Sequence, residues 1–344
     1  MFGLRSDGKK VKDANAVDRV QAFFVQKRSE SINYLTLKLP CEPLDDFIAK
    51  QRKDGNKYSY MHLIIATLVR VFYIRKKMNR FVSKGVLYQR NDISIAMDIN
   101  KKLEDDGERI PIKFMFTGKE SLPQVFKLIE KEIEENITGE SVSQTSVFAK
   151  KTAKKSSCLI RLKIAILKWL DKHGLLSKSK IKISPFHASC FFSNLKSIKL
   201  GYIYHHLYDF GTTSIYITMG KEKVEPAVID NKELSLSKDL TLGMSVDDRI
   251  ADGIYMEKTL RLIQEILANP DTLMQEMPDD GSIPKKVVKK KVKPAKKVKK
   301  IKSIKEKQQK IKPRKNKIKH DEKLEKARLK KEKKLLEKSL SSKK

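Results

Sequence analysis

The chain has 344 residues and a formal net charge of +33, with 75 Lys and Arg against 42 Asp and Glu. Residues 285–344 hold 29 basic and 6 acidic side chains, so the remainder has the balanced composition of a globular protein. Three cysteines without a CxxC pair indicate neither a disulfide framework nor a structural zinc site. Because the sequence contains no apolar signal segment and no run of roughly 18 apolar residues, we expect a cytoplasmic protein.

The first half of the chain predicts strands around one buried helix. Alternating apolar residues predict a strand over 32–39, and Pro43 opens a short helix that runs to about residue 50. Residues 60–74 are apolar on nearly all sides, which is typical of a helix inside a domain. Three further strands are predicted at 85–89, 93–99 and 110–116, with a turn at 90–92. An amphipathic helix follows at 121–137.

The middle of the chain looks like an insertion, which we place at 138–180. Residues 138–157 are rich in Ser, Thr and Lys without a period, which predicts a flexible connection. Residues 158–172 predict a basic amphipathic helix that contains the only tryptophan, Trp169. Its wide apolar face fits either burial in a core or a position at a membrane interface.

The second half is rich in predicted strands and ends in a helix and a basic segment. The strands are expected at 188–195, 214–219, 227–229 (with a turn at 230–231) and 241–246. A closing helix over 254–267 stops before Asn269 and Pro270. Residues 276–344 have little to bury and predict a disordered Lys-rich tail, while mixed charges at 321–338 also fit a solvated helix.

Three segments carry a family resemblance that covers most of residues 30–275. Residues 242–253, LGMSVDDRIADG, resemble the motif L-S-x-x-x-D-H-R-x-x-D/N-G of the catalytic domain of dihydrolipoamide acyltransferases and chloramphenicol acetyltransferases. Residues 190–195, CFFSNL, resemble that family's apolar strand ending in Ser-Asn-Leu. The Asn-Pro-Asp-Thr-Leu sequence after the closing helix resembles its N-P-E-x-L exit.

The resemblance implies an α/β domain over residues 1–275, with a mixed sheet flanked by helices as in chloramphenicol acetyltransferase. It further implies a homotrimer with active sites at subunit interfaces, and acyl transfer from an acyl-CoA, with coenzyme A as acyl carrier. In that family the motif histidine is the general base, and a serine of the neighbouring subunit stabilises the oxyanion. No segment resembles the family's lipoyl or subunit-binding modules, so we expect no lipoyl domain.

The motif histidine is replaced in this sequence by Asp248, whereas Asp247, Arg249, Asp252 and Gly253 match. A carboxylate with a reference pKa near 4 is a weak base unless burial or a neighbouring anion raises its pKa. Asp247 acts in that direction and Arg249 in the opposite one. Asp248 is therefore one of three candidate bases.

His205 and His206 are the other two candidate bases, since they lie between the strands expected at 188–195 and 214–219. Adjacent residues of an extended segment face opposite sides, so only one of them points into a given cavity. The alternative is a packing role among their neighbours Tyr202, Tyr204 and Tyr208.

Ser193 matches the family's oxyanion serine, and its alternative role is to hydrogen-bond the turn backbone together with Asn194. We expect Asp252 to be structural, either as the cap of the helix that begins near Ile254 or as the partner of a cation. Carboxylates gathered on a single turn are weak grounds for a cation site, so no metal is expected.

Two main hypotheses follow for function. The first is a CoA-dependent acyltransferase acting on a thiol, hydroxyl or amine, with Ser193 at the oxyanion and His205, His206 or Asp248 as base. The second is a trimeric scaffold that lost its base and attaches to anionic surfaces, peripheral to a membrane, through the basic helix and tail. A third hypothesis, a nucleic-acid-binding protein with a vestigial enzyme body, depends on charge alone. Residues 285–344 would bind any polyanion without reading its bases. The alternative is that these residues form a solvated tail with no binding role.

Overall fold

The computed structural model describes residues 5–101, 104, 107–138, 144–229 and 233–284, and these described residues belong to one compact unit. The disorder expected over 276–344 lies outside the described residues from residue 285 onward, as does the helix expected at 321–338. The division into a domain over 1–275 with an insertion at 138–180 stays a prediction.

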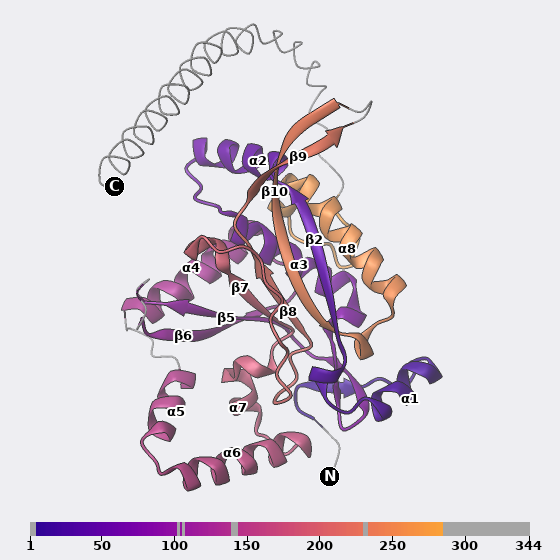
Figure 1. Cartoon of the computed structure of the whole chain (residues 1–344), viewed down its shortest axis with the longest axis vertical. Helices are drawn as coiled ribbons and strands as arrows, with labels where there is room; N and C mark the ends of the chain where they lie inside the picture. Colours follow the sequence, from indigo (N-terminus) through magenta and orange to yellow (C-terminus); the bar gives the residue numbers. More distant parts are fainter. Residues whose placement is uncertain (1–4, 102–103, 105–106, 139–143, 230–232, 285–344) are drawn as a thin grey trace, which may run out of the picture. The chain divides into compact units, whose positions relative to one another are not determined.

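The centre of the unit is a mixed sheet, in agreement with the expected fold class (Figure 1). Its strands lie side by side in the order β2 (Ile32–Pro40), β10 (Glu233–Asp247), β8 (Ile215–Met219), β7 (Cys190–Asn194), β5 (Ile93–Asn100) and β6 (Arg109–Phe116). β9 (Lys223–Ile229) pairs with the first half of β10, and the turn expected at 230–231 lies outside the described residues. β7 runs parallel to both β5 and β8, and the other pairs are antiparallel.

A second, three-stranded sheet is formed in the order β1 (Gly8–Lys10), β4 (Val86–Arg90) and β3 (Arg80–Ser83). The turn predicted at 90–92 thus connects strands of different sheets, and Arg90 is itself the last residue of β4. The buried Arg90 guanidinium donates to the Thr212 carbonyl at 2.7 Å and to the Thr212 hydroxyl at 3.1 Å, which ties the end of β4 to residue 212.

The helices are α1 (Ala16–Phe24), α2 (Glu42–Lys53), α3 (Tyr60–Ile74), α4 (Leu122–Thr138), α5 (Gln144–Ala153), α6 (Ser157–Lys172), α7 (Lys178–Ile183) and α8 (Gly253–Ala268). The bounds of α3 match the sequence prediction, and those of α8 differ by one residue at each end. The flexible connection predicted over 138–157 is wrong in part, because α5 occupies much of it. Among the described residues, no helix is both long enough and apolar enough to cross a membrane.

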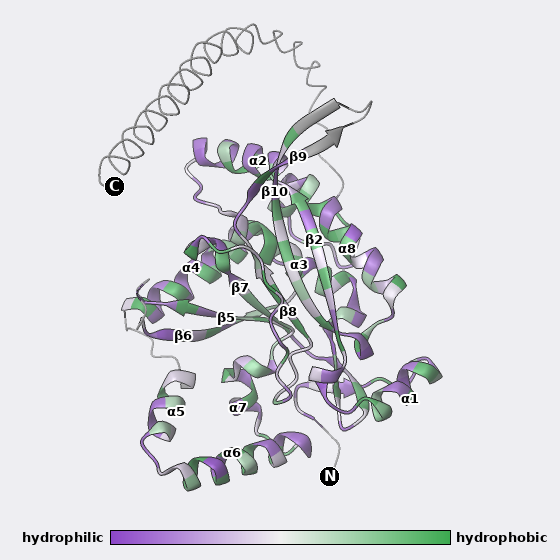
Figure 2. Ribbon diagram, viewed as in Figure 1, coloured by the Kyte–Doolittle hydropathy of each residue, from purple (hydrophilic) through white to green (hydrophobic). Residues whose placement is uncertain are grey.

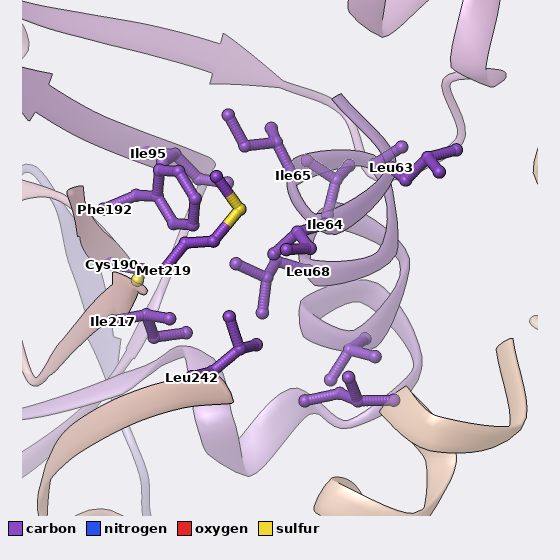
Figure 3. Close-up of a cluster of buried hydrophobic side chains, with 14 of the residues drawn as sticks. Leu63, Ile64, Ile65, Leu68, Ile95, Cys190, Phe192, Ile217, Met219 and Leu242 are labelled. Carbon is purple, nitrogen blue, oxygen red and sulfur yellow. The ribbon is translucent and has the colours of Figure 1, made fainter. Parts of the chain in front are cut away.

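The main hydrophobic core lies between α3 and one face of the sheet. Ile65 and Leu68 of α3 point toward Phe192 and Met219 of the sheet (Figure 3). On its other sides α3 contacts α4 and α8, so it is buried nearly all round. Arg70 of α3 is also buried, and its guanidinium donates to the carbonyls of residues 272, 273 and 275, which fixes the chain after α8. The opposite face of the sheet is free of these helices and carries the candidate site.

Candidate active site

Strand alternation places Ser193 on the face of the sheet opposite α3. Along β7, Cys190 and Phe192 belong to the main core, so Phe191 and Ser193 point the other way. Tyr216 of β8 shares that outer face, and its hydroxyl lies 2.8 Å from Ser193 Oγ. Ser193 therefore hydrogen-bonds a side chain across the sheet, whereas Asn194 Oδ1 accepts from the turn amide of residue 197 at 3.3 Å.

Residues 201–208 cross this outer face without regular secondary structure. The Tyr204 hydroxyl bonds the Thr36 hydroxyl on β2, and the Ile203 amide donates to Thr218 Oγ1 on β8 at 3.2 Å. Gly243 of β10 lies beneath the segment, where an added Cβ would stand 2.4 Å from the Ile203 carbonyl oxygen. A glycine is thus required here for the segment to approach the sheet, and this approach delivers His205 to the site.

His205 lies directly against Tyr216. The two rings stack with centroids 4.0 Å apart and planes 10° from parallel. His205 Nδ1 lies 2.9 Å from the His206 carbonyl oxygen, so Nδ1 carries a proton and donates it, which leaves Nε2 as an acceptor. Burial lowers the pKa of His205, and the hydrogen bond to the His206 carbonyl and the charge of Asp98 oppose this only partly. The ring is therefore neutral at pH 7, as a general base must be.

His206 is exposed, but its ring also belongs to this group of aromatic side chains. It contacts the His205 ring at 4.4 Å and the Tyr208 ring at 4.7 Å. The prediction that the adjacent histidines point to opposite sides is wrong, because both rings contact Tyr208 and the segment is not an extended strand. Tyr202 and Tyr204 pack edge to face with each other, at 5.8 Å between centroids.

Two members of the site were missed at the sequence level, Tyr216 and Asp98. Asp98 alternates along β5 with residues of the main core, so it shares the outer face with Tyr216. Desolvation raises the pKa of Asp98, whereas the charges of Arg109 and His205 lower it. The polar position in the otherwise apolar run ISIAMDI was a sign that one face of this strand does not lie in the core.

The DDR motif forms a buried ion cluster at the end of β10. The Asp247 carboxylate is fully buried and accepts from Arg249 Nε and Nη2, both at 2.7 Å, and from Ser31 Oγ at 2.9 Å. Arg28 Nε lies 3.6 Å from the same carboxylate. Arg28 also donates to the carbonyls of Tyr208 and Gly211. Arg28, which lies beside the Asp247 carboxylate, thus fixes the C-terminal end of the segment that carries the histidines.

Asp248 stands in a different environment. Burial raises its pKa, the charge of Asp247 raises it further, and Arg249 lowers it. Its Oδ1 atom is buried without a hydrogen-bond partner in the described part of the chain, and its amide donates to the Ser31 carbonyl at 2.9 Å. The sequence did not show whether Asp247 or Arg249 has the larger effect on Asp248. In the structure the pKa of Asp248 is raised, which makes it a better base than an ordinary aspartate.

One chain does not bring Asp248 to Ser193. In the strand register Ser193 of β7 lies opposite Thr218 of β8, and Thr218 lies opposite Gly243 of β10. Ser193 and Gly243 are therefore at the same height along the sheet, two strands apart. Asp248 lies five residues beyond Gly243, about 16 Å along the strand direction at roughly 3.3 Å per residue. A base at Asp248 would need a Ser193 from another subunit, whereas His205 reaches the Ser193–Tyr216 pair within the chain.

Asp252 caps α8, as predicted, because its Oδ1 accepts from the Tyr255 amide at 2.8 Å. It also pairs with Lys77 at 3.4 Å. The neighbouring Gly253 has open space where a Cβ would stand, so nothing in the structure explains a glycine there. Within the described residues, no group of three or more His, Cys, Asp or Glu could hold a metal ion; the prediction of no metal site stays a prediction.

The basic helix predicted at 158–172 corresponds to α6, and it has two apolar faces. Ile164 and Leu167 face inward and are partly buried, whereas Leu162 is 56% exposed and Trp169 is 53% exposed. Figure 2 shows hydrophilic and hydrophobic residues alternating along α6. One apolar face of α6 therefore packs inward, and the other is presented to the surroundings. A position at a membrane interface stays a prediction.

A buried ion network that sequence reasoning missed connects the end of α6 to the sheet. Asp171 accepts from Arg5 Nη2 at 2.7 Å, and His187 Nε2 lies 3.1 Å from the same carboxylate oxygen. Arg5 also pairs with Asp7 at 2.8 Å. These contacts join the N-terminal segment, α6 and the turn before β7, so they define where α6 sits.

Comparisons with known proteins give structural likeness only. No protein-family model matches the sequence, and no curated protein matches it. A probable dihydrolipoamide acetyltransferase from Listeria monocytogenes is similar at 13% identity and a TM-score of 0.46, covering 76% of this chain and 94% of that one. The cubic core of the pyruvate dehydrogenase multienzyme complex is similar at 12% identity and a TM-score of 0.44, covering 77% of this chain and 94% of that one. A chloramphenicol acetyltransferase is similar at 10% identity and a TM-score of 0.45, covering 76% of this chain and 99% of that one.

The chain is thus similar to the same acyltransferase cores that its motifs resemble. At these values the likeness concerns the fold alone. The roles of its residues rest on the geometry described above.

Proposed function

We propose that this protein transfers an acyl group from a coenzyme A thioester to a thiol, hydroxyl or amine acceptor. The observation that carries the proposal is the cluster of Ser193, Tyr216 and His205 on the outer face of the sheet. It combines a hydroxyl donor with a neutral imidazole whose Nε2 has no partner among the described residues. Acyl transfer needs these two groups, a donor for the oxyanion and a base for the acceptor.

In the proposed reaction, His205 Nε2 removes the proton of the acceptor as its electron pair attacks the thioester carbonyl. The carbonyl oxygen becomes an oxyanion, to which the Ser193 hydroxyl donates. In this proposal the Tyr216 hydroxyl, 2.8 Å from Ser193 Oγ, acts as the donor of their hydrogen bond, so that the Ser193 proton remains free for the oxyanion. When the intermediate collapses, the C–S bond breaks and the coenzyme A thiolate takes the proton from the His205 imidazolium.

A homotrimer offers a second arrangement for the same reaction. If subunits pair the Ser193 cluster of one copy with the η5 turn (Asp248–Ile250) of the next, Asp248 becomes the base. Its raised pKa and the unpartnered Oδ1 favour this arrangement. The two arrangements differ in the residue whose loss stops turnover.

The experiment measures thiol release from acetyl-CoA by the full chain with thiol, hydroxyl and amine acceptors. We expect His205→Asn to lower kcat by about 10²–10⁴-fold, the range for loss of a general base. His206→Asn is the matched control, since it removes the exposed neighbouring imidazole, and its rate should stay within a few-fold of wild type. Loss with Asp248→Asn alone would assign the base to the subunit interface. No turnover together with no binding of coenzyme A by calorimetry would overturn the proposal.

A second candidate function is attachment to an anionic surface, and the exposed face of α6 favours it. Leu162, Ile166 and Trp169 are each about half exposed, and Lys168 and Lys172 lie on the same helix. This pattern is typical of helices that lie in a membrane interface. The charge of residues 285–344 would add to such binding, or to binding of nucleic acid, in a salt-dependent way.

Cosedimentation of the full chain with anionic and neutral vesicles tests this attachment. We expect binding to anionic vesicles with a blue shift of Trp169 fluorescence, and Leu162→Ser with Ile166→Ser should abolish the shift. Binding that depends on residues 285–344 alone, with unchanged Trp169 fluorescence, would contradict a role for α6.

A further inference from the structure

A cavity of about 330 Å³ lies beneath α6, between the helices of the insertion and the turn before β7. Its walls are almost entirely apolar, formed by Phe148, Ile164, Leu167, Leu176, Phe186 and Phe210. Native cores contain few voids larger than a water molecule, so a cavity of this size is more than imperfect packing. It has the volume and the apolar lining of a small ligand site.

Two exposed lysines, Lys168 and Lys180, line the cavity almost entirely with their aliphatic stems. Neither amine has an ion-pair or hydrogen-bond partner within the described residues. Lys168 and Phe210 also line a neighbouring cavity of about 530 Å³, to which Lys84 and Lys172 and the carboxylates of Asp171 and Asp209 contribute. The apolar chamber therefore lies beside the unpaired amines of Lys168 and Lys180.

We propose that this chamber binds the hydrocarbon chain of a single-chain anionic amphiphile, whose phosphate or carboxylate lies at Lys168 and Lys180. At roughly 30 Å³ per methylene, about the share of one water molecule, the chamber holds about ten carbons. Each methylene removed from water strengthens binding by about fourfold. Lysine amines supply the charge that an anionic head requires.

The site is separate from the proposed catalytic cluster. Phe186 lies between the chamber and Tyr208, with ring centroids 5.0 Å apart, and Tyr208 in turn lies 6.0 Å from the His205 ring. The binding proposal therefore does not depend on acyl transfer at Ser193. Either a free fatty acid or a lysophospholipid from a membrane would present the required chemistry.

The test is calorimetric titration of the full chain with fatty acids and with alkyl phosphates of about six to fourteen carbons, as monomers. Affinity should rise about fourfold per methylene and level off near ten carbons. Preference for the carboxylate series would indicate a free fatty acid, and preference for the phosphate series a lysophospholipid. Equal affinity at all chain lengths would overturn the proposal.

Paired variants locate the binding. Leu167→Trp fills the chamber and should weaken binding more than tenfold, whereas Leu162→Trp on the outer face of α6 should leave it unchanged. If circular dichroism shows that Leu167→Trp unfolds the protein, Leu167→Ala serves instead, and the enlarged chamber should shift the plateau to longer chains. Lys168→Gln with Lys180→Gln should weaken binding, with Lys182→Gln as control. Lipid binding that appears only with vesicles and survives every chamber variant would contradict the chamber as its site.

Discussion

We expect Asp247→Asn to lower the free energy of unfolding by about 3–5 kcal/mol, the cost of removing one partner from a buried ion pair. The Asp247 carboxylate is fully buried and neutralises Arg249, which bonds it through two nitrogens, and Arg28, which lies 3.6 Å away. Without that charge both guanidinium groups remain buried beside each other. Their hydrogen bonds to backbone carbonyls stay in place but provide no compensating anion.

The matched control is Asp248→Asn at the adjacent position. Burial and the charge of Asp247 raise the pKa of Asp248, so folding favours its neutral form. The stability that this group contributes is present at low pH and is lost as the pH rises through its folded pKa, so at pH 7 its charge destabilises the fold. An amide at Asp248 should therefore leave the stability at pH 7 unchanged or higher.

The assay is urea unfolding at pH 7, followed by far-ultraviolet circular dichroism, with both variants beside wild type. The expected result is a large loss for Asp247→Asn and none for Asp248→Asn. If the two variants agree within about 1 kcal/mol, the reasoning about the buried ion cluster is refuted, since surface-like carboxylates give such small effects.

Three further predictions concern a lysine, a glycine and a histidine. Burial lowers the pKa of Lys113 to about 7, so above that pH the unfolded chain binds more protons than the folded chain. The free energy of unfolding should therefore rise from about pH 7 to 10.5, by up to about 1.4 kcal/mol per pH unit. Unfolding titrations of Lys113→Met should show no such rise. Gly243→Ala should destabilise the protein by about 1–3 kcal/mol in urea unfolding and lower kcat, because its Cβ collides with the Ile203 carbonyl; wild-type stability and rate would contradict the placement of that segment. For His205, burial lowers the pKa, so kcat/KM should fall with decreasing pH only below about 6.5, and an acidic limb above that value would argue against it as base.

Much of the fold could be predicted because its elements bury strongly patterned faces. The largely apolar run of α3 follows directly from burial on nearly all sides, and the alternation in β2 follows from burial on one face. Elements with weak apolar patterns were missed. The sequence predicts a flexible connection where α5 lies, because Ser, Thr and Lys dominate this segment. Its few apolar side chains, such as Phe148, which lines a cavity, form no clear period.

Tertiary contacts decided what local patterns left open. The predicted turn at 90–92 gave no sign that the strands on either side of it, β4 and β5, belong to separate sheets. In the structure the buried Arg90 bonds Thr212 instead. The two arcs of α6 are both apolar, so periodicity alone gave no means to tell which one packs inward.

The candidate site shows the same limit. Ser193 and the histidines could be named from motif and position, but the link between them is Tyr216, which only the strand register reveals. The orientation of His205 depends on how residues 201–208 cross the sheet, and an irregular segment has no period from which to derive it. For the same reason the sequence could not distinguish His205 from His206.

The most direct test of the central claim is the steady-state rate of acetyl-CoA consumption by wild type, Ser193→Ala and Tyr216→Phe, each shown to be folded by circular dichroism. If Ser193 donates to the oxyanion, Ser193→Ala should lower kcat by about 10²–10³-fold. Tyr216→Phe removes the hydroxyl that bonds Ser193 and should give a smaller loss in the same direction. A Ser193→Ala protein that turns over at the wild-type rate would contradict acyl transfer at this cluster.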